Sequence, residues 1–202
     1  AYQGGAYGQG ILSRYPIKKV ENIRLSLLKP DSLRQSLALL VAEVDIPGQG
    51  RVLFANAHFS LDAATRLKQA EEVLQYLKKR KLPAIFVGDL NATPEQPEIR
   101  LLLSQLTAAS DLDQPSFPTE APDKTIDYIF FNSRLKGKPL QSKVPPIHHS
   151  DHLPVLSTIQ LRIPTNMFTS AADMSAAFPS YTSKSAVYVL SSGRCQISTQ
   201  AL

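Results

Sequence analysis

Apolar residues in this chain are gathered into short runs separated by turn residues, and this spacing restricts the fold more than any other feature. Most runs are rich in Val, Ile, Leu and Phe and are too short for a helix, so they predict β-strands. The expected strands cover residues 11–13, 23–28, 37–46, 52–57, 84–87, 126–131 and 155–161. Residues 47–50 (Pro-Gly-Gln-Gly) have the composition of a turn, which predicts an antiparallel hairpin of the two strands beside it.

Helical periodicity occurs in a long segment, residues 63–79, and in a shorter one, residues 97–105. The longer segment has a possible N-cap at Asp62 and ends before Pro83. Its apolar face comprises Leu67, Ala70, Val73, Leu74 and Leu77. The shorter helix is expected to bury Ile99, Leu102, Leu103 and Leu106. Strands covered by helices predict an α+β protein.

The chain has 202 residues, enough for one hydrophobic core, and we expect one domain over residues 1–163. From Pro164 onward Ser, Thr and Ala replace the periodic pattern, so residues 164–202 are expected to be a tail or linker. No apolar run approaches the roughly 20 residues that span a bilayer, so we expect a soluble protein whose location stays open. The single cysteine, Cys195, excludes an internal disulfide.

The formal net charge is +5, which favours anionic partners such as phosphorylated substrates without naming one. The densest basic run, residues 78–81 (Lys-Lys-Arg-Lys), lies at the expected end of the longer helix. Cations are favoured there by the helix dipole, so a nucleic-acid patch is the less favoured reading of this run. No obligate protein partner is evident.

Clusters of polar residues follow directly after expected strands. They are residues 56–62 (Asn-Ala-His-Phe-Ser-Leu-Asp), 88–94 (Gly-Asp-Leu-Asn-Ala-Thr-Pro) and 148–155 (His-His-Ser-Asp-His-Leu-Pro-Val). Asp127 also interrupts an apolar strand, where a buried carboxylate needs a hydrogen-bond partner. Histidine is the natural partner, because a carboxylate fixes the imidazole tautomer and stabilises its charged form. All four histidines lie in these clusters.

Each motif alone is more typical of a structural role, since strand ends often carry a histidine and Gly-Asp-x-Asn is a common turn. The order His58, Gly-Asp-Leu-Asn at 88–91, Asp127 and then Ser-Asp-His at 150–152 is far more specific. With residues 7–17 (Tyr-Gly-Gln-Gly-Ile-Leu-Ser-Arg-Tyr-Pro-Ile), and with Arg66 and Gln69 at family-like spacing, this order resembles the endonuclease/exonuclease/phosphatase superfamily. Its members include deoxyribonuclease I, apurinic endonucleases, sphingomyelinases and inositol-polyphosphate phosphatases.

The resemblance covers residues 7–161 and implies a deoxyribonuclease I-like fold, a two-layer β-sandwich flanked by helices. It also implies hydrolysis of phosphoester bonds with Mg²⁺ or Mn²⁺, which neutralise charge on the phosphoryl oxygens and assist the leaving alkoxide. The substrate could be a small molecule, a lipid head group or a nucleic acid. The absence of tryptophan and of long basic or aromatic insertions argues against a dedicated DNA enzyme.

The same resemblance implies roles for individual residues. Asp151 looks like a metal ligand, and Asp89 with Asn91 looks like the pair that places the attacking water and the phosphate. His152, braced by Asp127, and His58 look like the groups that face the phosphoryl oxygens. The catalytic candidates are therefore His58, Asp89, Asn91, Asp127 and His152, and the substrate-binding candidates are His58, Asn91 and His149.

The chain departs from the family pattern at its start. Family members begin with a strand that carries an Asn near the phosphate and a segment that carries a metal-binding Glu, and neither precedes Tyr7. We therefore expect a chain that lacks its first strands and hydrolyses phosphoesters weakly or not at all. The alternative is a non-catalytic binding or scaffold module on the same fold.

Overall fold

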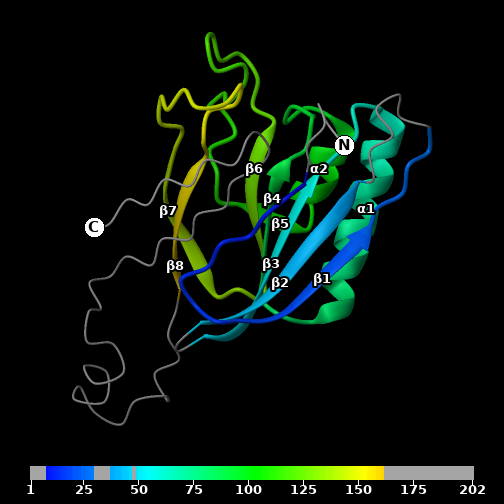
Figure 1. Ribbon diagram of the computed structural model, residues 1–202, viewed down its shortest axis with the longest axis vertical. Helices are drawn as coiled ribbons and strands as arrows, with labels where there is room; N and C mark the ends of the chain where they lie inside the picture. Colours follow the sequence, from blue (N-terminus) through cyan, green and yellow to red (C-terminus); the bar gives the residue numbers. More distant parts are fainter. Residues whose placement is uncertain (1–7, 30–36, 47–48, 162–202) are drawn as a thin grey trace.

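A six-stranded mixed sheet forms the centre of the computed structural model, which describes residues 8–29, 37–46 and 49–161 (Figure 1). In chain order the elements are β1 (Ile17–Arg24), β2 (Ala38–Ile46), β3 (Gly50–His58), α1 (Ala63–Arg80), β4 (Ala84–Asp89), α2 (Pro97–Leu103), β5 (Leu106–Ala108), β6 (Asp127–Asn132), β7 (Gly137–Lys143) and β8 (Leu156–Leu161). The large sheet has the order β1-β2-β3-β4-β6-β5, and β7 pairs with β8 in a second sheet.

Strand direction in the large sheet brings several strand ends to one edge. β2 and β3 form the antiparallel hairpin that the sequence predicts. β3 and β4 are parallel, and α1 makes the crossover between them. β6 is antiparallel to β4, so β6 begins where β3 and β4 end. The polar clusters after β3 and β4 therefore lie beside the start of β6.

The long helix α1 begins and ends where local chemistry favours it. The Asp62 carboxylate accepts a hydrogen bond from the Thr65 backbone N–H at 2.9 Å, which satisfies a donor that the first turn leaves open. The helix ends at Arg80, because the following residue, Lys81, has a left-handed φ of 55° that stops the helical repeat. Basic residues in the last turn interact favourably with the negative C-terminal end of the helix dipole. The expected N-cap is confirmed.

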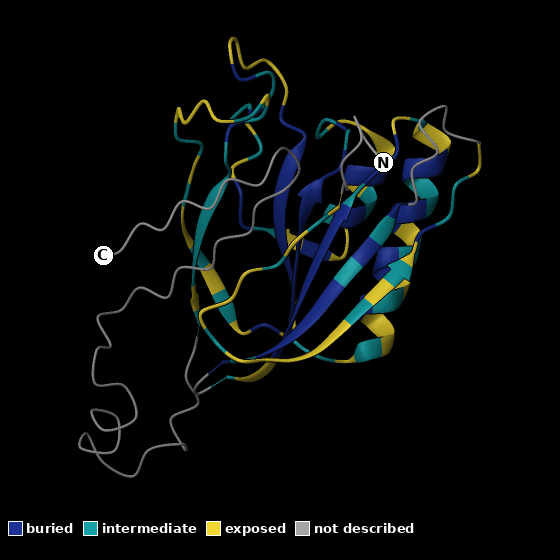
Figure 2. Ribbon diagram, in the orientation of Figure 1, coloured by how far each residue is buried: buried dark blue, intermediate teal, exposed yellow. Residues whose placement is uncertain are grey.

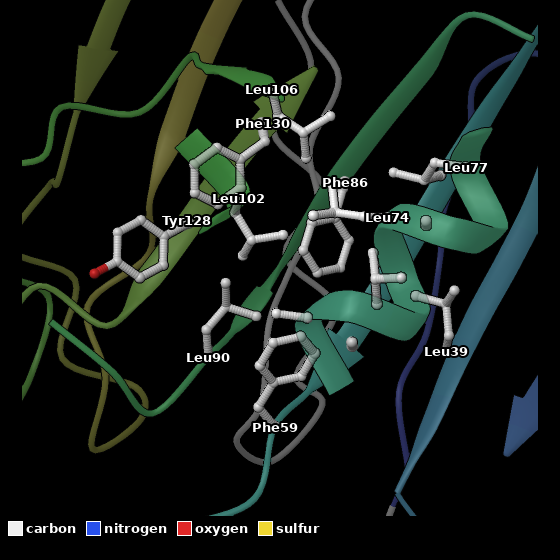
Figure 3. Packing of buried hydrophobic residues seen from close by; sticks show 14 of the residues in the cluster. Leu39, Phe59, Leu74, Leu77, Phe86, Leu90, Leu102, Leu106, Tyr128 and Phe130 are labelled. Carbon is white, nitrogen blue, oxygen red and sulfur yellow. The ribbon is translucent and has the colours of Figure 1, made fainter. Parts of the chain in front are cut away.

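The large sheet is covered differently on its two sides (Figure 1). Its helix face packs against α1 and α2 and comprises Leu39, Val41, Leu53, Ala55, Ala57, Phe86, Tyr128 and Phe130 (Figure 3). Its sheet face packs against β8 and comprises Ala42, Val44, Val52, Phe54, Ile85, Val87, Ile129 and Phe131. Both sets alternate along the strands, and the central strands are almost entirely buried (Figure 2). The predicted α+β class is confirmed.

Several strand predictions are wrong in detail. Residues 11–13 are not a strand, although Ile11 packs half-buried on the sheet face. The strand expected at 23–28 is β1, which runs from Ile17 to Arg24 as an edge strand with exposed Ile17 and Val20. β5 and β7 were not predicted, because β5 is short and β7 is mostly exposed and carries Lys, Gln, Ser and Pro.

The expected tail at residues 164–202, including its apolar run at 186–190, lies outside the described residues. None of the described helices is both long enough and apolar enough to cross a membrane.

Candidate active site

Strand register places the first three site residues side by side. His58 at the end of β3 is the Cα partner of Asp89 at the end of β4, and Asp89 is the Cα partner of Asp127 at the start of β6. Residues opposite one another on neighbouring strands project to the same side of a sheet. Ile85 and Val87 of β4 lie on the sheet face, so Asp89 and its two partners continue that face. The site is thus the polar end of an apolar stripe.

Gly88 allows β3 and β4 to approach at this point. A Cβ on Gly88 would lie 1.8 Å from the carbonyl oxygen of Ala57, its partner on β3. No other residue fits without separating the strands. The glycine of the Gly-Asp-Leu-Asn motif therefore holds Asp89 beside His58.

Asp127 and His152 form a close pair. The His152 Nδ1 atom lies 2.8 Å from the Asp127 Oδ2 atom, and the Asp127 residue is 3% exposed. This contact leaves the second imidazole nitrogen of His152, Nε2, 3.7 Å from the Asp89 Oδ2 atom. The Phe117 ring packs on the imidazole with a centroid distance of 4.6 Å. The carboxylate behind the ring thus selects its tautomer and its orientation.

His58 and Asn91 complete the cluster on the other side of Asp89. The His58 Nε2 atom lies 3.5 Å from Asp89 Oδ2 and 3.0 Å from the Asn91 amide nitrogen. That amide also donates to the Phe59 carbonyl at 2.9 Å, and the Asn91 backbone N–H donates to Asp89 Oδ1 at 2.9 Å. Asn91 adopts a left-handed φ of 49°, a conformation that asparagine tolerates. An amide donor at Nε2 requires that this nitrogen accept, so the proton of a neutral His58 lies on Nδ1.

Burial and neighbouring charges shift the acid–base behaviour of the site. Burial raises the pKa of Asp89, and the charge of Asp127 adds to the rise, while His58 and His152 act in the opposite direction. Burial alone disfavours the His152 imidazolium, but its hydrogen bond with Asp127 and the charges of Asp127, Asp89 and Asp151 leave the pKa of His152 raised. The site favours a positive charge among its carboxylates.

A divalent cation fits this donor set. Asp89, Asp127 and His152 each offer one ligand atom, and these atoms lie within 4.8 Å of one another. Carboxylate oxygens suit Mg²⁺ and Mn²⁺, and an imidazole nitrogen suits Mn²⁺ better than Mg²⁺. Two buried carboxylates in one place also gain from a neighbouring cation, since burial penalises their charge. Asp151, the ligand expected from the sequence, is exposed and stands outside this group.

The structure brings together His58, Asp89, Asn91, Asp127 and His152. Asp151 precedes His152 in the chain and its carboxylate accepts a hydrogen bond from the Ser150 hydroxyl at 3.1 Å. His149 is exposed in the connection between β7 and β8. The metal-binding role of Asp151 and the substrate-binding role of His149 stay predictions.

Sequence reasoning missed Ser116, a buried residue whose hydroxyl donates to Asp127 Oδ2 at 2.6 Å. It also missed Glu98 of α2, the buried partner of Arg66. The Arg66 guanidinium in turn donates to the Leu61 carbonyl at 2.7 Å, which ties the loop after His58 to both helices. Only a charge on the apolar side of α2 signalled Glu98, and a lone serine in a Pro-rich loop carries no signal.

The model of the endonuclease/exonuclease/phosphatase family matches residues 1–152 of this chain. The chain belongs to that family. Among curated protein sequences, none matches significantly. The match contains the whole cluster from His58 to His152, so the predicted family resemblance is confirmed. Family membership gives the coarse class, a hydrolase fold shared by phosphatases and nucleases.

Solved structures of family members share the fold. An endonuclease/exonuclease/phosphatase family protein from Bacteroides thetaiotaomicron is 18% identical with a TM-score of 0.60, over 72% of this chain and 63% of its own. The human Nocturnin catalytic domain, solved with a bound sulfate anion, is 21% identical with a TM-score of 0.61, over 74% and 61%. A mannosyl-6-phosphatase from Bacteroides thetaiotaomicron is 19% identical with a TM-score of 0.59, over 72% and 67%. This chain thus spans 61% to 67% of the length of these neighbours.

Proposed function

We propose that this family member is a hydrolase of phosphoester bonds that uses Mg²⁺ or Mn²⁺. The observation that carries the proposal is the Asp127–His152 pair. The His152 Nδ1 atom contacts Asp127, and its Nε2 atom lies 3.7 Å from the Asp89 Oδ2 atom. An imidazole held by a carboxylate behind it is an arrangement that purely structural histidines rarely need. Its convergence with His58 and Asn91 gives several hydrogen-bonding groups around one position.

In this mechanism Asp89 and Asn91 orient the attacking water. Asp89 Oδ2 lies between the two histidines, so a water beside it has an acceptor for its proton. His152 Nε2 donates to a phosphoryl oxygen, and Asp127 stabilises the imidazolium that gives this donation its strength. His58 faces the phosphoryl group from the opposite side of Asp89.

Asp89 and Asp127, with the neighbouring Asp151, are the residues that would hold the cation, which leaves the His152 Nε2 atom to the phosphoryl oxygen. When bound, Mg²⁺ or Mn²⁺ would neutralise charge on the phosphoryl oxygens and on the leaving alkoxide. The side chains of the site supply the remaining requirements, which are to place the attacking water and to hold the phosphoryl group in one orientation. Neither a cysteine nor a serine nucleophile is required.

Small phosphomonoesters or phosphodiesters are the substrates that we favour. One structural neighbour is named a mannosyl-6-phosphatase and another binds a sulfate anion, which shares the tetrahedral shape of phosphate. The net charge of +5 supports an anionic substrate. A nucleic acid or a lipid head group would be contacted by surfaces beyond the described cluster.

The test is hydrolysis of bis-p-nitrophenyl phosphate and p-nitrophenyl phosphate with Mg²⁺ or Mn²⁺, with and without EDTA. We expect weak, EDTA-sensitive release of p-nitrophenol, in line with the expectation from the sequence, and His152→Ala should lower it by roughly 10²- to 10⁴-fold, the usual size of a lost acid–base group. Release that survives EDTA would contradict the metal mechanism. Release unchanged in His152→Ala would contradict the assigned site.

A non-catalytic binding module is the second candidate. Two observations favour it. The possible metal ligands found among the described residues, Asp89, Asp127 and His152, include no glutamate, and Asp151 is exposed outside that group. Such a module would bind the cation and a phosphate without turnover. Mn²⁺ binding by calorimetry that Asp89→Asn abolishes, with no p-nitrophenol release from either substrate, would support this candidate over the hydrolase.

A further inference from the structure

The loop before β6 closes on itself and lies against the site. Phe117 and Lys124 form an isolated antiparallel bridge, in which the Lys124 N–H donates to the Phe117 carbonyl at 2.9 Å. The Ser116 and Phe117 N–H groups both donate to the Lys124 carbonyl, at 2.9 and 3.1 Å. The Asp123 N–H also donates to the Phe117 carbonyl, at 3.0 Å, and four backbone hydrogen bonds across one short loop make it a defined support and not a variable connection.

Ser116 extends this support to the Asp127 carboxylate. Its hydroxyl donates to Asp127 Oδ2 at 2.6 Å, and His152 Nδ1 lies 2.8 Å from the same oxygen. A carboxylate oxygen offers about two lone-pair sites, so these two donors fill them. Together they fix the rotation of the carboxylate about its own bond. Ser116 is 0% exposed, so its hydroxyl cannot be a substrate contact.

The same loop also holds the backbone on either side of His152. The Leu153 N–H donates to the Ser116 carbonyl at 2.7 Å. The Thr119 N–H donates to the Asp151 carbonyl at 2.9 Å, and the Thr119 hydroxyl donates to the Ser150 carbonyl at 2.7 Å. Both partners of the Asp127–His152 pair are therefore held by one loop, and Ser116 is the residue that contacts both sides.

We propose that Ser116 is a positioning residue of this site, which holds Asp127 in the orientation that keeps the His152 Nδ1–H bonded and aims Nε2 at the reacting group. The inference rests on the proposed function for its effect on turnover, but its geometric part stands without it. Loss of the hydroxyl removes a donor from Asp127 Oδ2, which loosens the orientation of the carboxylate and of the imidazole that it holds.

The geometric part is tested by NMR on the full chain without substrate. The His152 Nδ1–H proton resonance, identified by its disappearance in His152→Gln, should shift or broaden by exchange in Ser116→Ala. Ser110→Ala is the matched control, because Ser110 is also buried beside β6 and its hydroxyl accepts from the Ile129 N–H at 3.1 Å, away from the pair. An unchanged resonance in a folded Ser116→Ala protein would overturn the proposal.

The functional part is tested by kinetics with bis-p-nitrophenyl phosphate. Ser116→Ala should lower kcat by roughly 10- to 100-fold, the usual cost of losing a group that orients a site residue, with KM within about twofold. Ser116→Thr keeps the donor and should recover most of kcat, whereas Ser110→Ala should leave kcat unchanged. A shifted resonance with unchanged kcat would overturn the positioning role. If the parent chain is inactive, the proposed function fails while the NMR result still decides the geometry.

Discussion

The two faces of the large sheet are built from the same strands but treat polar groups differently. On the helix side, the buried polar side chains are paired: Gln69 bonds both the Ser60 N–H and the Ser26 carbonyl, and Arg66 pairs with Glu98. On the sheet face, the Asn56 Oδ1 atom is buried without a partner among the described residues, and burial raises the pKa of Asp89. Only the sheet face carries the candidate site.

This difference indicates a division between stability and function within one sheet. Paired polar groups and close apolar packing contribute stability on the helix face. The sheet face buries the Asn56 Oδ1 atom and the Asp89 carboxylate, which water would solvate in the unfolded chain. Burial of such groups lowers the stability of the fold, as is common at functional sites. Substitutions on the helix face should therefore change stability more than turnover, and those on the sheet face the reverse.

The largest expected effect belongs to Gly88, which lies where β3 and β4 approach one another closely. Gly88→Ala should cost more than roughly 4 kcal/mol in free energy of unfolding, because its Cβ meets a backbone oxygen that cannot move alone. Urea denaturation measures this. In the control Gly137→Ala the new Cβ would lie 2.9 Å from the Ile159 Cγ2 atom, a side-chain atom that can shift. Equal costs at the two glycines would contradict the close-approach argument.

Asp89→Asn should separate the two properties on the sheet face. We expect activity to fall about 10³-fold, equivalent to about 4 kcal/mol, because the acceptor for the water proton is lost. Stability with EDTA present should stay equal or rise, because the variant no longer buries a charge.

The sign of this stability effect depends on pH. Since the folded pKa of Asp89 is raised, its carboxyl favours the folded state most below the ordinary aspartate pKa, and that contribution is lost as pH rises through the folded pKa. The advantage of Asp89→Asn should therefore grow with pH over this range. If Asp89→Asn were less stable than the parent at neutral pH, burial would not disfavour the charged Asp89 carboxylate as we infer.

Leu102→Ala tests the helix face, where the leucine of α2 is fully buried in the cluster of Figure 3. We expect a loss of about 3 kcal/mol in free energy of unfolding from the lost contacts and the cavity. Turnover per folded molecule, normalised by circular dichroism, should stay within about twofold of the parent. A large fall in kcat at full folding would show that the faces are not separable.

The smallest effect is expected at Asn56. Its amide donates to the Gly10 carbonyl at 3.2 Å, while Oδ1 has no partner among the described residues. Asn56→Leu loses that hydrogen bond, which lowers stability. It also removes a buried acceptor that has lost its water without gaining a partner, which raises stability by a similar amount. Stability should change by less than about 1 kcal/mol by urea denaturation. A loss above about 2 kcal/mol would show that Oδ1 has a partner in the folded chain.

The sequence predicted the fold best where periodicity and burial agree. α1, the β2–β3 hairpin and β6 were placed within a few residues, because their apolar patterns match the faces that they bury. β1 was misplaced, because Leu25 is buried after the strand has ended. β7 owes its conformation to pairing with β8, which no local pattern encodes.

The candidate site was predictable to the extent that its residues carry unusual chemistry for their positions. Asp127 in an apolar strand required a partner, and the structure places His152 at hydrogen-bonding distance. Ser116 was not predictable, since a serine in a loop has the same local sequence whether its hydroxyl faces water or a carboxylate. The exposure of Asp151 depends on the path of the loop before β8, which tertiary contacts decide.

The crossover through α1 has a consequence for the order of folding. The β2–β3 hairpin closes a short loop and can form early, but it delivers only His58 to the site. The parallel pairing that adds Asp89 must wait until α1 has docked, and the Asp127–His152 contact requires a further connection through β7. The site is therefore among the last parts to assemble, and hydrolytic activity recovered during refolding would report complete folding more strictly than secondary-structure signals do.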